Sequence, residues 1–395
     1  MRIERIETLA YQAPIDQPFG FSQWWFTKRS ALLVRVVTDD GTEGWGEVFA
    51  HVEPTVYGAV IGKALAPVYM GANPLDAGVL WDRAYNRSRP YGQKGMIINA
   101  LSGIDIALWD LNGKILGQPV SQLLGGRRRE RIESYATGLY RTETDDLPGA
   151  LAAEARGYAE QGFTAMKLKI GYGFDIDMEN LRAVRAAIGP SIRLALDANH
   201  GYDVPDAVRL GRAAAEYDIL WYEEPVVAED KAGYAEVRAR QPIPVAGGEE
   251  EFTRYGFRDL FEARGVDLAQ PDLGGMGGLS EARIVATMAS AFGVRCQPHV
   301  WGTPVALAAS LHFLSWLPDV PGSATPTQPM LEYDRSLHPI RDSVAVAPEK
   351  SLPWVDVPDG PGLGVEMRLD AAEQYLVDRT VITAADVRAA ASTRE

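Results

Sequence analysis

Charged side chains recur at a regular spacing in the middle of the chain, and this pattern restricts the fold more than any other feature. Each charged residue stands at the downstream end of a short apolar run that is typical of a β-strand. These residues are Lys167, Lys169, Asp197, Glu223, Glu249, Asp272 and His299. From Asp197 onward they lie 23 to 27 residues apart, which is enough for a strand, a helix and two short loops. The pattern predicts repeated βα units whose charged ends meet at one rim, the layout of a (β/α)8 active site.

The alternation of strands and helices extends on both sides of this segment. We expect strands near 131–138, 165–170, 192–199, 219–225, 244–249, 267–272, 295–300 and 328–334. Asp203, followed by Pro205, is a typical helix start, because a capping residue precedes a first-turn proline. Eight consecutive units favour a closed α/β barrel, TIM-like, over an open doubly wound sheet. The open sheet would also need a glycine-rich phosphate fingerprint after its first strand, and the sequence has none there.

The residues before the barrel predict a second domain. Residues 1–13 alternate as in a strand, and residues 31–49 indicate two strands joined at Asp39-Asp40-Gly41. Helical periodicity then runs from Val56 to Gly117. We therefore divide the chain into an N-terminal α+β domain (1–126), a (β/α)8-type barrel (127–350) and a C-terminal tail (351–395). We expect the tail to pack back on the first domain and to end in an amphipathic helix near 380–392, and we expect the basic cluster at 127–129 to be a solvated connector.

Composition and charge exclude several classes of protein. With 395 residues and 46% hydrophobic residues, the chain is long enough for two domains and a substantial core. Its net charge of −14 disfavours nonspecific binding to nucleic acid. The single cysteine, Cys296, excludes an intramolecular disulfide framework and fits a reducing compartment. No apolar run reaches transmembrane length and the charged start lacks a secretory signal, so we expect a cytoplasmic enzyme without a membrane partner.

Three of the regularly spaced residues are candidate metal ligands. Asp197, Glu223 and Glu249 end three consecutive strands, so one rim of the barrel would bring three carboxylates together. Their repulsion would be relieved by a hard divalent cation, and a ligand set made only of oxygen suits Mg²⁺, with Mn²⁺ as an alternative. Alternation along a strand points the neighbouring Glu224 and Glu250 the other way. The structural alternative is that each acid caps a helix or pairs with an arginine.

The remaining charged residues suggest proton transfer. Lys167 and Lys169 share one face of a strand, and burying two lysines together would lower the pKa of at least one, giving a general base. Asp272 would fix the imidazole tautomer of His299 and leave its other nitrogen free to exchange a proton. Glu332, at the end of the eighth strand, would hydrogen-bond to a substrate oxygen as an acid. The alternatives are a solvated lysine pair and a structural histidine.

Together these residues define a reaction. The metal and the lysines would hold a substrate carboxylate and stabilise the dianion formed when the α-proton is removed. A base would stand on either face of the substrate, Lys169 on one and His299 on the other.

The motifs that carry these residues resemble the enolase superfamily, in its mandelate racemase subgroup (the mandelate racemase/muconate lactonizing enzyme family). They are KLKIG, LDANHGY, EEPV, AGGE, QPDLGG and PHVWGT, and the resemblance extends from the hairpin TDDGTEGWGE to the tail. Within the subgroup, LSGIDIALWD, QPIPVAGGE, RYG and PDGPGLG are similar to galactarolactone cycloisomerase-like proteins.

This resemblance implies a role for each candidate residue. Asp197, Glu223 and Glu249 would bind Mg²⁺, Lys169 would be one acid/base, and the His299–Asp272 dyad the other. Lys167 would lower the pKa of Lys169 and contact the substrate carboxylate, and Glu332 would be the strand-eight acid. The first domain would cap the barrel, with the aromatic stretch Phe19–Phe26 as a loop over the site. The candidates for substrate contacts are Asn199, Trp24, Trp25, His51 and Trp301. The family also implies a homo-oligomer, a dimer or an octamer.

The sequence therefore predicts a Mg²⁺-dependent enzyme that removes the α-proton of a small carboxylate, an acid sugar or its lactone. The first hypothesis is cycloisomerisation, in which the enediolate expels the ring oxygen and opens the ring to a keto acid. The second is dehydration of an open-chain aldonate or aldarate, and a racemase or epimerase is the third. A barrel that binds sugars without catalysis would be expected to lack at least one ligand or base, and all are present.

Overall fold

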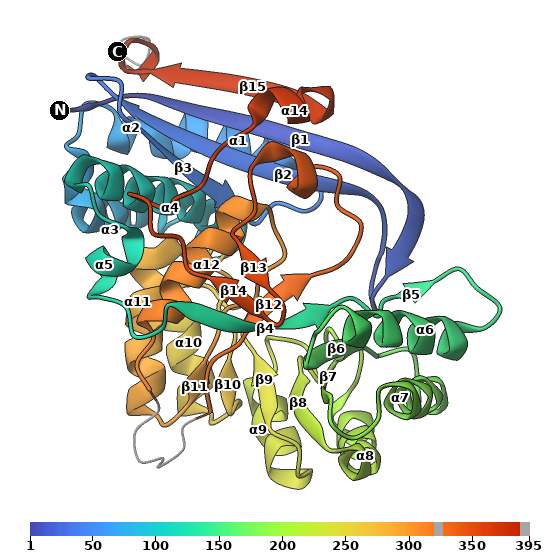
Figure 1. Cartoon of the computed structure of the whole chain (residues 1–395). Coiled ribbons are helices and arrows are strands. Elements are labelled where there is room, and N and C mark those ends of the chain that lie inside the picture. Colours follow the sequence, from blue (N-terminus) through green and yellow to red (C-terminus); the bar gives the residue numbers. More distant parts are fainter. Residues whose placement is uncertain (320–326, 388–395) are drawn as a thin grey trace.

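A computed structural model of the chain describes residues 1–319 and 327–387. Figure 1 shows an N-terminal sheet with its helices lying against a barrel of alternating strands and helices. In the part of the chain that is described, no helix combines the length and the apolar character needed to span a bilayer.

The N-terminal domain is built on an antiparallel meander. Its strands are β1 (Ile3–Gly20), β2 (Trp25–Thr38) and β3 (Glu43–Val48), and its helices are α1 (Pro54–Val60), α2 (Ala66–Tyr69), α3 (Ala77–Ser88), α4 (Met96–Leu116) and α5 (Val120–Leu124). A π-helical turn, Ile61–Leu65, joins α1 to α2, and a 3-10 turn, Pro74–Asp76, precedes α3. The long helix α4 packs directly on β3. A Cβ atom on Gly46 would lie 2.0 Å from Gly103 O, so only glycine allows this approach.

The aromatic stretch 19–26 is a β-hairpin tip rather than the expected loop. The strands β1 and β2 continue to Gly20 and from Trp25, and Phe21 N donates to Trp24 O across the turn (3.0 Å). Ser22 Oγ at the tip donates to the carbonyls of Ala198 (2.8 Å) and Asn199 (2.9 Å) beyond the barrel strand β7. The correction has a physical cause, because pairing along the hairpin outweighs the irregular local sequence. The hairpin therefore extends from the first domain to the barrel.

The barrel contains all eight predicted strands. They are β4 (Arg131–Thr137), β6 (Ala165–Lys169), β7 (Arg193–Asp197), β8 (Ile219–Glu223), β9 (Val245–Gly247), β10 (Leu268–Ala269), β11 (Arg295–Cys296) and β12 (Leu331–Asp334). The intervening helices are α6 (Leu147–Glu160), α7 (Phe174–Ile188), α8 (Val204–Ala214), α9 (Lys231–Arg240), α10 (Thr253–Glu262), α11 (Gly278–Ala291) and α12 (Pro304–Trp316). Two short elements, β5 (Arg141–Thr142) and the 3-10 turn Ala215–Tyr217, lie in the connections. Asp203 caps α8 as predicted, accepting from Asp206 N (3.0 Å).

Parallel pairing runs in sequence order from β4 to β11, and β12 pairs in parallel with β4. Side chains connect the β11 and β12 regions. Met330 N donates to Gln297 Oε1 (3.2 Å), and Val300 N donates to Glu332 Oε2 (2.9 Å). The carboxyl ends of all eight strands therefore face the same rim, beneath the N-terminal domain.

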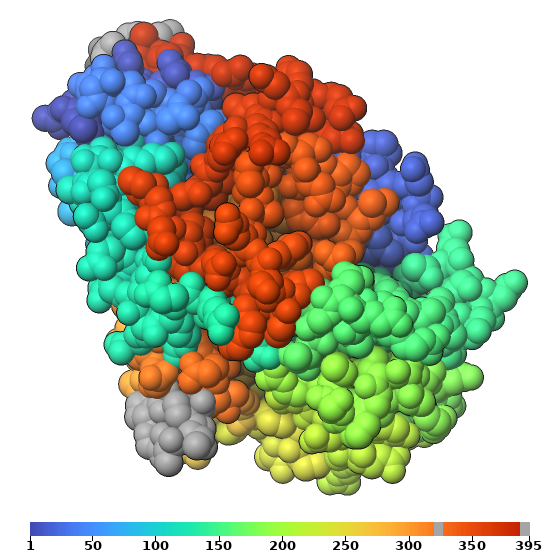
Figure 2. All heavy atoms as spheres, in the orientation of Figure 1, coloured from blue at the N-terminus to red at the C-terminus, as the bar shows by residue number. Residues whose placement is uncertain are grey.

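The C-terminal tail contacts both domains. Its elements are α13 (Arg341–Val344), β13 (Lys350–Ser351), β14 (Trp354–Asp356), α14 (Leu369–Ala372), the 3-10 turn Glu373–Tyr375 and β15 (Leu376–Thr383). β14 pairs antiparallel with β4, and β15 pairs antiparallel with β1. In Figure 2 this segment, in orange-red, lies over the junction between the N-terminal domain and the barrel.

The predicted helix at 380–392 is wrong for its first residues. Residues 380–383 belong to β15, because edge pairing with β1 fixes them in an extended form. Residues 384–387 are helical, and 388–395 lie outside the described residues.

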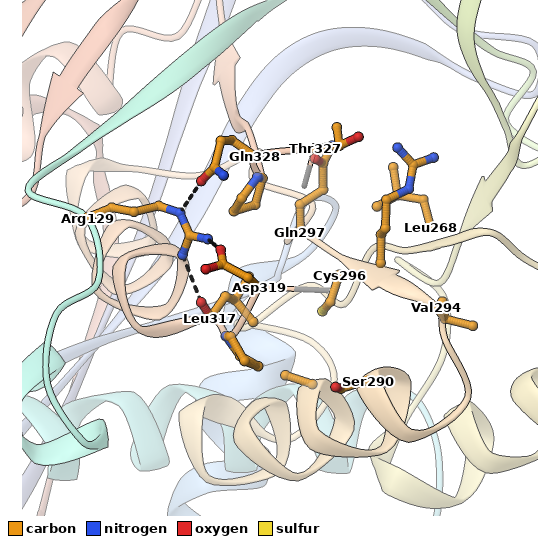
Figure 3. Close-up of a pocket in the computed structure, with 14 residues that line it drawn as sticks. Arg129, Leu268, Ser290, Val294, Cys296, Gln297, Leu317, Asp319, Thr327 and Gln328 are labelled. Carbon is orange, nitrogen blue, oxygen red and sulfur yellow. Dashed lines mark hydrogen bonds and ion pairs between the residues drawn. The ribbon is translucent and has the colours of Figure 1, made fainter. Parts of the chain in front are cut away.

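The arginines of the basic connector at 127–129 are also paired with neighbouring residues, so the prediction of a solvated connector is wrong. Arg127 is ion-paired with Asp359. Arg129 is ion-paired with Asp319 and donates to Leu317 O (2.7 Å). Figure 3 shows Arg129 beside a cavity of about 40 Å³ that Leu268 and Cys296 also line, at the strands β10 and β11. The arginines thus fasten the start of β4 to neighbouring loops instead of forming a binding patch.

Candidate active site

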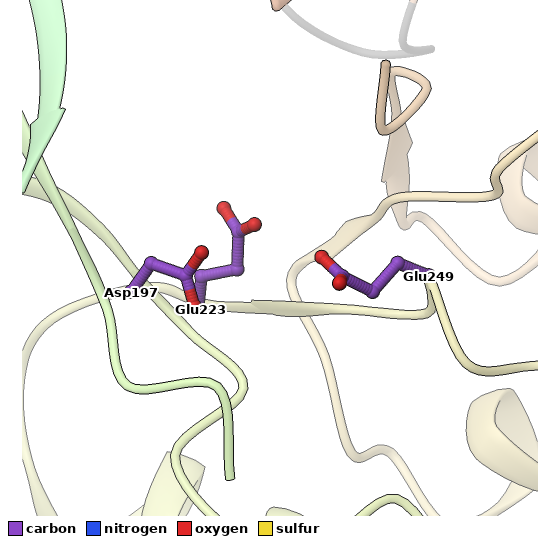
Figure 4. Close-up of side chains that lie close together, drawn as sticks. All are labelled: Asp197, Glu223 and Glu249. Carbon is purple, nitrogen blue, oxygen red and sulfur yellow. The ribbon is translucent and has the colours of Figure 1, made fainter. Parts of the chain in front are cut away.

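Three carboxylates meet at the rim, as the spacing predicts. One oxygen each of Asp197, Glu223 and Glu249 lies within 4.8 Å of the others, and Figure 4 shows the three carboxylates around a common space. Asp197 and Glu223 are fully buried. The second oxygen of Glu249, Oε2, is buried and has no hydrogen-bond partner in the described parts of the chain. An oxygen-only donor set with an unpartnered buried oxygen fits a hard divalent cation.

The two lysines of β6 point into the same cluster but have different surroundings. Lys167 is fully buried, and its Nζ lies 2.5 Å from Glu223 Oε1 and 2.8 Å from Glu332 Oε1. Lys169 Nζ lies 2.5 Å from Asp197 Oδ2 and donates to Asn199 Oδ1 (3.0 Å). Of these two amines, only that of Lys169 borders the open cavity above the cluster. The solvated-pair alternative is therefore excluded.

The predicted fall in a lysine pKa is not what the structure gives. Burial lowers the pKa of Lys169, but Asp197, Tyr140 and Glu249 together raise it more, so the net direction is upward. The pKa of Lys167 is also raised, because Glu223 and Glu332 outweigh its burial. The prediction considered the repulsion between the two ammonium groups. It did not consider the attraction of each ammonium group to the nearby carboxylates, which raises the pKa. A cation held by those same carboxylates would act in the opposite direction on both lysines.

Asp272 and His299 form the predicted dyad. His299 Nδ1 lies 2.7 Å from Asp272 Oδ2, and the two residues are joined by a parallel β-bridge. The other ring nitrogen, Nε2, faces Glu249 Oε2 at 3.7 Å. Burial lowers the pKa of His299, but Glu249, Glu332 and the Asp272 hydrogen bond raise it to about 10. The imidazole is thus oriented by Asp272 and directed at the carboxylate cluster.

Glu332 lies at the site but not in the protonated form that was predicted. It is fully buried, accepts from Thr137 Oγ1 (2.7 Å) and Val300 N (2.9 Å), and contacts the Lys167 ammonium. Burial raises its pKa, but Lys167, His299 and the hydrogen bond from Thr137 together lower it to about 2. These three donors hold Glu332 as a carboxylate that positions Lys167.

The neighbouring acids, Glu224 and Glu250, have hydrogen-bond or ion-pair partners outside the three-carboxylate cluster. Glu250 is half exposed and pairs with His200 (3.5 Å). Glu224 is buried at a positive φ of 41° and accepts from Asn199 Nδ2 (3.3 Å). Burial raises the pKa of Glu224 well above its usual range, with Glu249 adding to the shift. Asn199 therefore sits beside the site as predicted, bridging Glu224 to Lys169.

A cavity of about 320 Å³ opens above the cluster, between the barrel and the N-terminal domain. Trp24, His51 and Trp301 line it, as do Lys169, Asn199 and His299. Trp25 is not among the residues that line it, and its role as a substrate contact stays a prediction. It lies next to Trp24 on the hairpin, and its ring instead stacks under Arg141, whose guanidinium carbon is 4.8 Å from the ring centroid.

Several lining residues were missed from the sequence. They are Phe21, Gln23, Phe26, Phe49, Val52, Tyr140, His200 and Glu250. Phe49 follows β3 directly, and Tyr140 follows β4, so position after a strand end was an available signal. Phe21 and Phe26 could be placed only once the hairpin register was known, since adjacent residues face opposite sides.

Comparisons with known proteins agree with this architecture. The model for the mandelate racemase/muconate lactonizing enzyme N-terminal domain matches residues 5–125, and the enolase C-terminal domain-like model matches residues 150–372. D-galactarolactone cycloisomerase from Agrobacterium fabrum is 44% identical over 95% of this chain and 99% of that protein. D-galactonate dehydratase from Ralstonia nicotianae is 33% identical over 88% of this chain and 91% of that protein.

A solved structure has the same fold throughout. The crystal structure of 3,6-anhydro-D-galactonate cycloisomerase from Zobellia galactanivorans matches with a TM-score of 0.85 and 38% identity, over 96% of this chain and 100% of that one. These relatives carry the names of isomerases and lyases. The chain belongs to the mandelate racemase/muconate lactonizing enzyme family of the enolase superfamily.

Proposed function

We propose that this chain is a Mg²⁺-dependent enzyme that removes the α-proton of an acid sugar or its lactone. One observation carries the proposal. Two proton-transfer groups reach the carboxylate cluster from different strands, Lys169 at Asp197 and His299 at Glu249, inside one cavity. A substrate carboxylate bound at the cluster would place its α-carbon between a lysine and a histidine. That is the geometry required for proton abstraction next to a carboxylate.

Each residue then has a distinct task. Asp197, Glu223 and Glu249 would hold Mg²⁺, which when bound would supply positive charge beside the substrate carboxylate and favour its enediolate form. Lys169 would take the α-proton, and Asp272 would keep His299 oriented so that Nε2 exchanges a proton on the opposite side. Lys167, held by Glu223 and Glu332, would add positive charge without transferring a proton.

Ring opening is the preferred outcome. The α-carbon–hydrogen bond breaks and the proton goes to the base, while the electron pair moves into the enediolate. That pair then expels the ring oxygen from the β-carbon, and the resulting enol takes up a proton to become a keto acid. The product is an isomer of the substrate. The names of two relatives support ring opening, since both a lactone cycloisomerase and an anhydro-sugar cycloisomerase match over nearly the whole chain.

Dehydration of an open-chain acid sugar is the second candidate. It shares the first step and differs in the group that leaves, a hydroxyl that His299 would protonate. The similarity to D-galactonate dehydratase over 88% of the chain favours it.

Proton NMR in D₂O distinguishes these outcomes. The protein with Mg²⁺ would be tested against aldonates, aldarates, aldarate monolactones and anhydro-aldonates. We expect the α-proton signal of a cyclic acid to disappear as a keto acid forms. Reaction of open-chain acids alone would establish a dehydratase, and deuterium exchange without a new product an epimerase. No change with any compound would contradict the proposal.

We further propose the domain division 1–126, 127–350 and 351–395, with the tail completing the capping domain through β15. The pairing of β15 with β1 supports this, although β14 joins the tail to the barrel as well. A homo-oligomer, dimer or octamer, and a cytoplasmic location stay predictions. Light scattering on the purified protein would give the oligomeric state.

A further inference from the structure

A buried carboxylate outside the active-site cavity connects two of the loops that border the carboxylate cluster. Asp177 lies in the first turn of α7, and its side chain leans back towards the residues before the helix. It accepts from Gly171 N (2.7 Å) and Tyr172 N (3.2 Å) in the loop after β6. It also accepts from the hydroxyl of Tyr202 in the loop after β7. One carboxylate thus fixes these two loops relative to each other.

The tip of the β1–β2 hairpin rests on the same two loops. A Cβ atom on Gly171 would lie 2.7 Å from the Ser22 Cβ and 2.7 Å from Ala198 O, so the tip and the two loops meet closely at this glycine. The Tyr172 hydroxyl donates to Gly20 O at the end of β1 (3.4 Å). Both residues that the buried carboxylate holds after β6 therefore contact the hairpin.

The position of the tip affects the cavity directly. Phe21, Gln23 and Trp24 line it from the tip, and Gln23 Nε2 also donates to His200 O in the loop after β7 (3.5 Å). The tip supplies surface for binding, whereas the groups proposed to transfer protons and to hold the cation come from barrel strands. A displaced tip should therefore weaken substrate binding more than it slows the chemical step.

We propose that Asp177 is a positioning residue for substrate binding. It holds the loops after β6 and β7 in the arrangement on which the hairpin tip rests, and it thereby sets the shape of the cavity beneath the tip. Asp177 itself does not line that cavity, so it acts only through these loops. This inference rests on the proposed function, in which the cavity receives the substrate.

Two substitutions at Asp177 test the role. Alanine removes the acceptor, whereas asparagine keeps one acceptor oxygen for the two backbone N–H groups and gains an amide that can donate to the Tyr202 oxygen. Both would be measured with a compound that the Mg²⁺-loaded wild type turns over. For Asp177→Ala we expect KM to rise about tenfold, the loss typical of a hydrogen bond to a charged group, while kcat changes by less than about threefold. Asp177→Asn should restore KM to near the wild-type value.

Asp267 provides the matched control. It makes the same kind of contacts at the opposite end of the barrel, where it accepts from Val245 N (2.9 Å) and from Arg238 Nε (2.8 Å). Asp267→Ala should lower Tm and leave KM unchanged. Equal KM values for Asp177→Ala and Asp267→Ala would show that Asp177 has only a general structural role, and the inference would be overturned.

Milder variants test the route through the hairpin. Tyr202→Phe removes one hydroxyl donor to Asp177, and Ser22→Ala removes the hydroxyl with which the tip holds the loop after β7. Each should raise KM. If both act on the position of the tip, the double variant should raise KM by less than the product of the two single effects. Effects that simply multiply would mean that Asp177 and the tip act independently, against the proposal.

Hydrogen–deuterium exchange of the backbone amides at 19–27, followed by mass spectrometry, needs no substrate. We expect faster exchange there in Asp177→Ala than in the wild type, and no such change in Asp267→Ala. Unchanged exchange at 19–27 would overturn the inference even if turnover fell. If the wild type turned over no acid sugar, the proposed function would fail, and amide exchange would still decide whether Asp177 holds the tip.

Discussion

Lys167 and Lys169 are two residues apart on β6, yet their amines have different surroundings. Lys167 is enclosed by Glu223 and Glu332 and has no access to the cavity, whereas Lys169 contacts Asp197 and lines it. The side chain that borders the substrate space is the one able to exchange a proton with substrate. In the proposed mechanism Lys169 therefore transfers the proton and Lys167 has a positioning role.

Lys169→Met tests this assignment, because methionine keeps the length of the side chain and removes the amine. We expect kcat to fall by about 10² to 10⁴-fold, the usual contribution of a general base. Circular dichroism would confirm that the variant folds, and Lys63→Met on the exposed surface is the matched control. Turnover within a factor of a few of the control would remove Lys169 from the mechanism.

The β1–β2 hairpin is the element that closes the cavity. Its tip is held where Ser22 donates to the loop after β7, and it brings Phe21, Trp24 and Phe26 over the carboxylates. The contact is very close. A Cβ atom on Gly201 would lie 2.9 Å from Ala198 O and 3.0 Å from the Ser22 Cβ. The loop therefore has no room for a side chain between the barrel and the hairpin.

Gly201→Ala should displace the hairpin tip. Overpacking of this kind costs about 1–3 kcal/mol, so we expect KM to rise by about tenfold, with a smaller effect on kcat. Gly157→Ala is the matched control, because a Cβ atom there meets nothing within 4 Å. Steady-state kinetics of both variants would check this, and equal KM values would mean that the hairpin does not form part of the binding site.

The sequence could predict the barrel strands because the signal for each strand lies within its own short stretch of residues. An apolar run that ends in a charged residue placed β6, β7 and β8 within one or two residues, and their matched spacing brought Asp197, Glu223 and Glu249 together. Elements that depend on distant partners were not predictable in this way. Residues 380–383 are a strand because β1 pairs with them, more than 370 positions earlier in the chain.

The orientation of side chains and the shifts in lysine pKa values could likewise not be predicted from the sequence. Trp24 and Trp25 differ in their surroundings through the hairpin register, which places one at the cavity and the other against Arg141. The raised pKa values of the lysines depend on which carboxylate oxygens lie closest, and spacing along the chain does not contain that information.

Buried polar contacts join the N-terminal domain to the barrel. Arg29 on β2 reaches Asp334 and Ser336 at the end of β12, and its guanidinium packs on Trp301. Glu47 on β3 accepts from Thr303 N (2.9 Å) and Ala306 N (3.1 Å) at the start of α12. The N-terminal residues that line the cavity are thereby held in a fixed position over the carboxylates.

Arg29→Ala should destabilise the molecule. Asp334 would keep its ion pair with Arg341 (2.9 Å), so we expect a loss of about 1–3 kcal/mol from the missing hydrogen bonds of the buried guanidinium. We expect a clear fall in Tm by calorimetry, together with a raised KM as Trp301 loses its support. Arg240→Ala, which breaks a half-exposed pair with Glu236 on α9, is the control. Equal Tm values for the two variants would show that Arg29 does not hold the domains together.

In the proposed mechanism, α-proton abstraction depends on a divalent cation held by Asp197, Glu223 and Glu249. The most direct measurement is α-proton exchange in D₂O after chelation and after return of Mg²⁺, for the wild type, Glu249→Gln and the adjacent Glu250→Gln. Mn²⁺ binding by electron paramagnetic resonance would be recorded on the same samples. We predict that chelation stops exchange and that Mg²⁺ restores it in the wild type and in Glu250→Gln. Glu249→Gln should bind Mn²⁺ weakly and stay inactive. Exchange that survives chelation, or that Mg²⁺ restores fully in Glu249→Gln, would contradict the account.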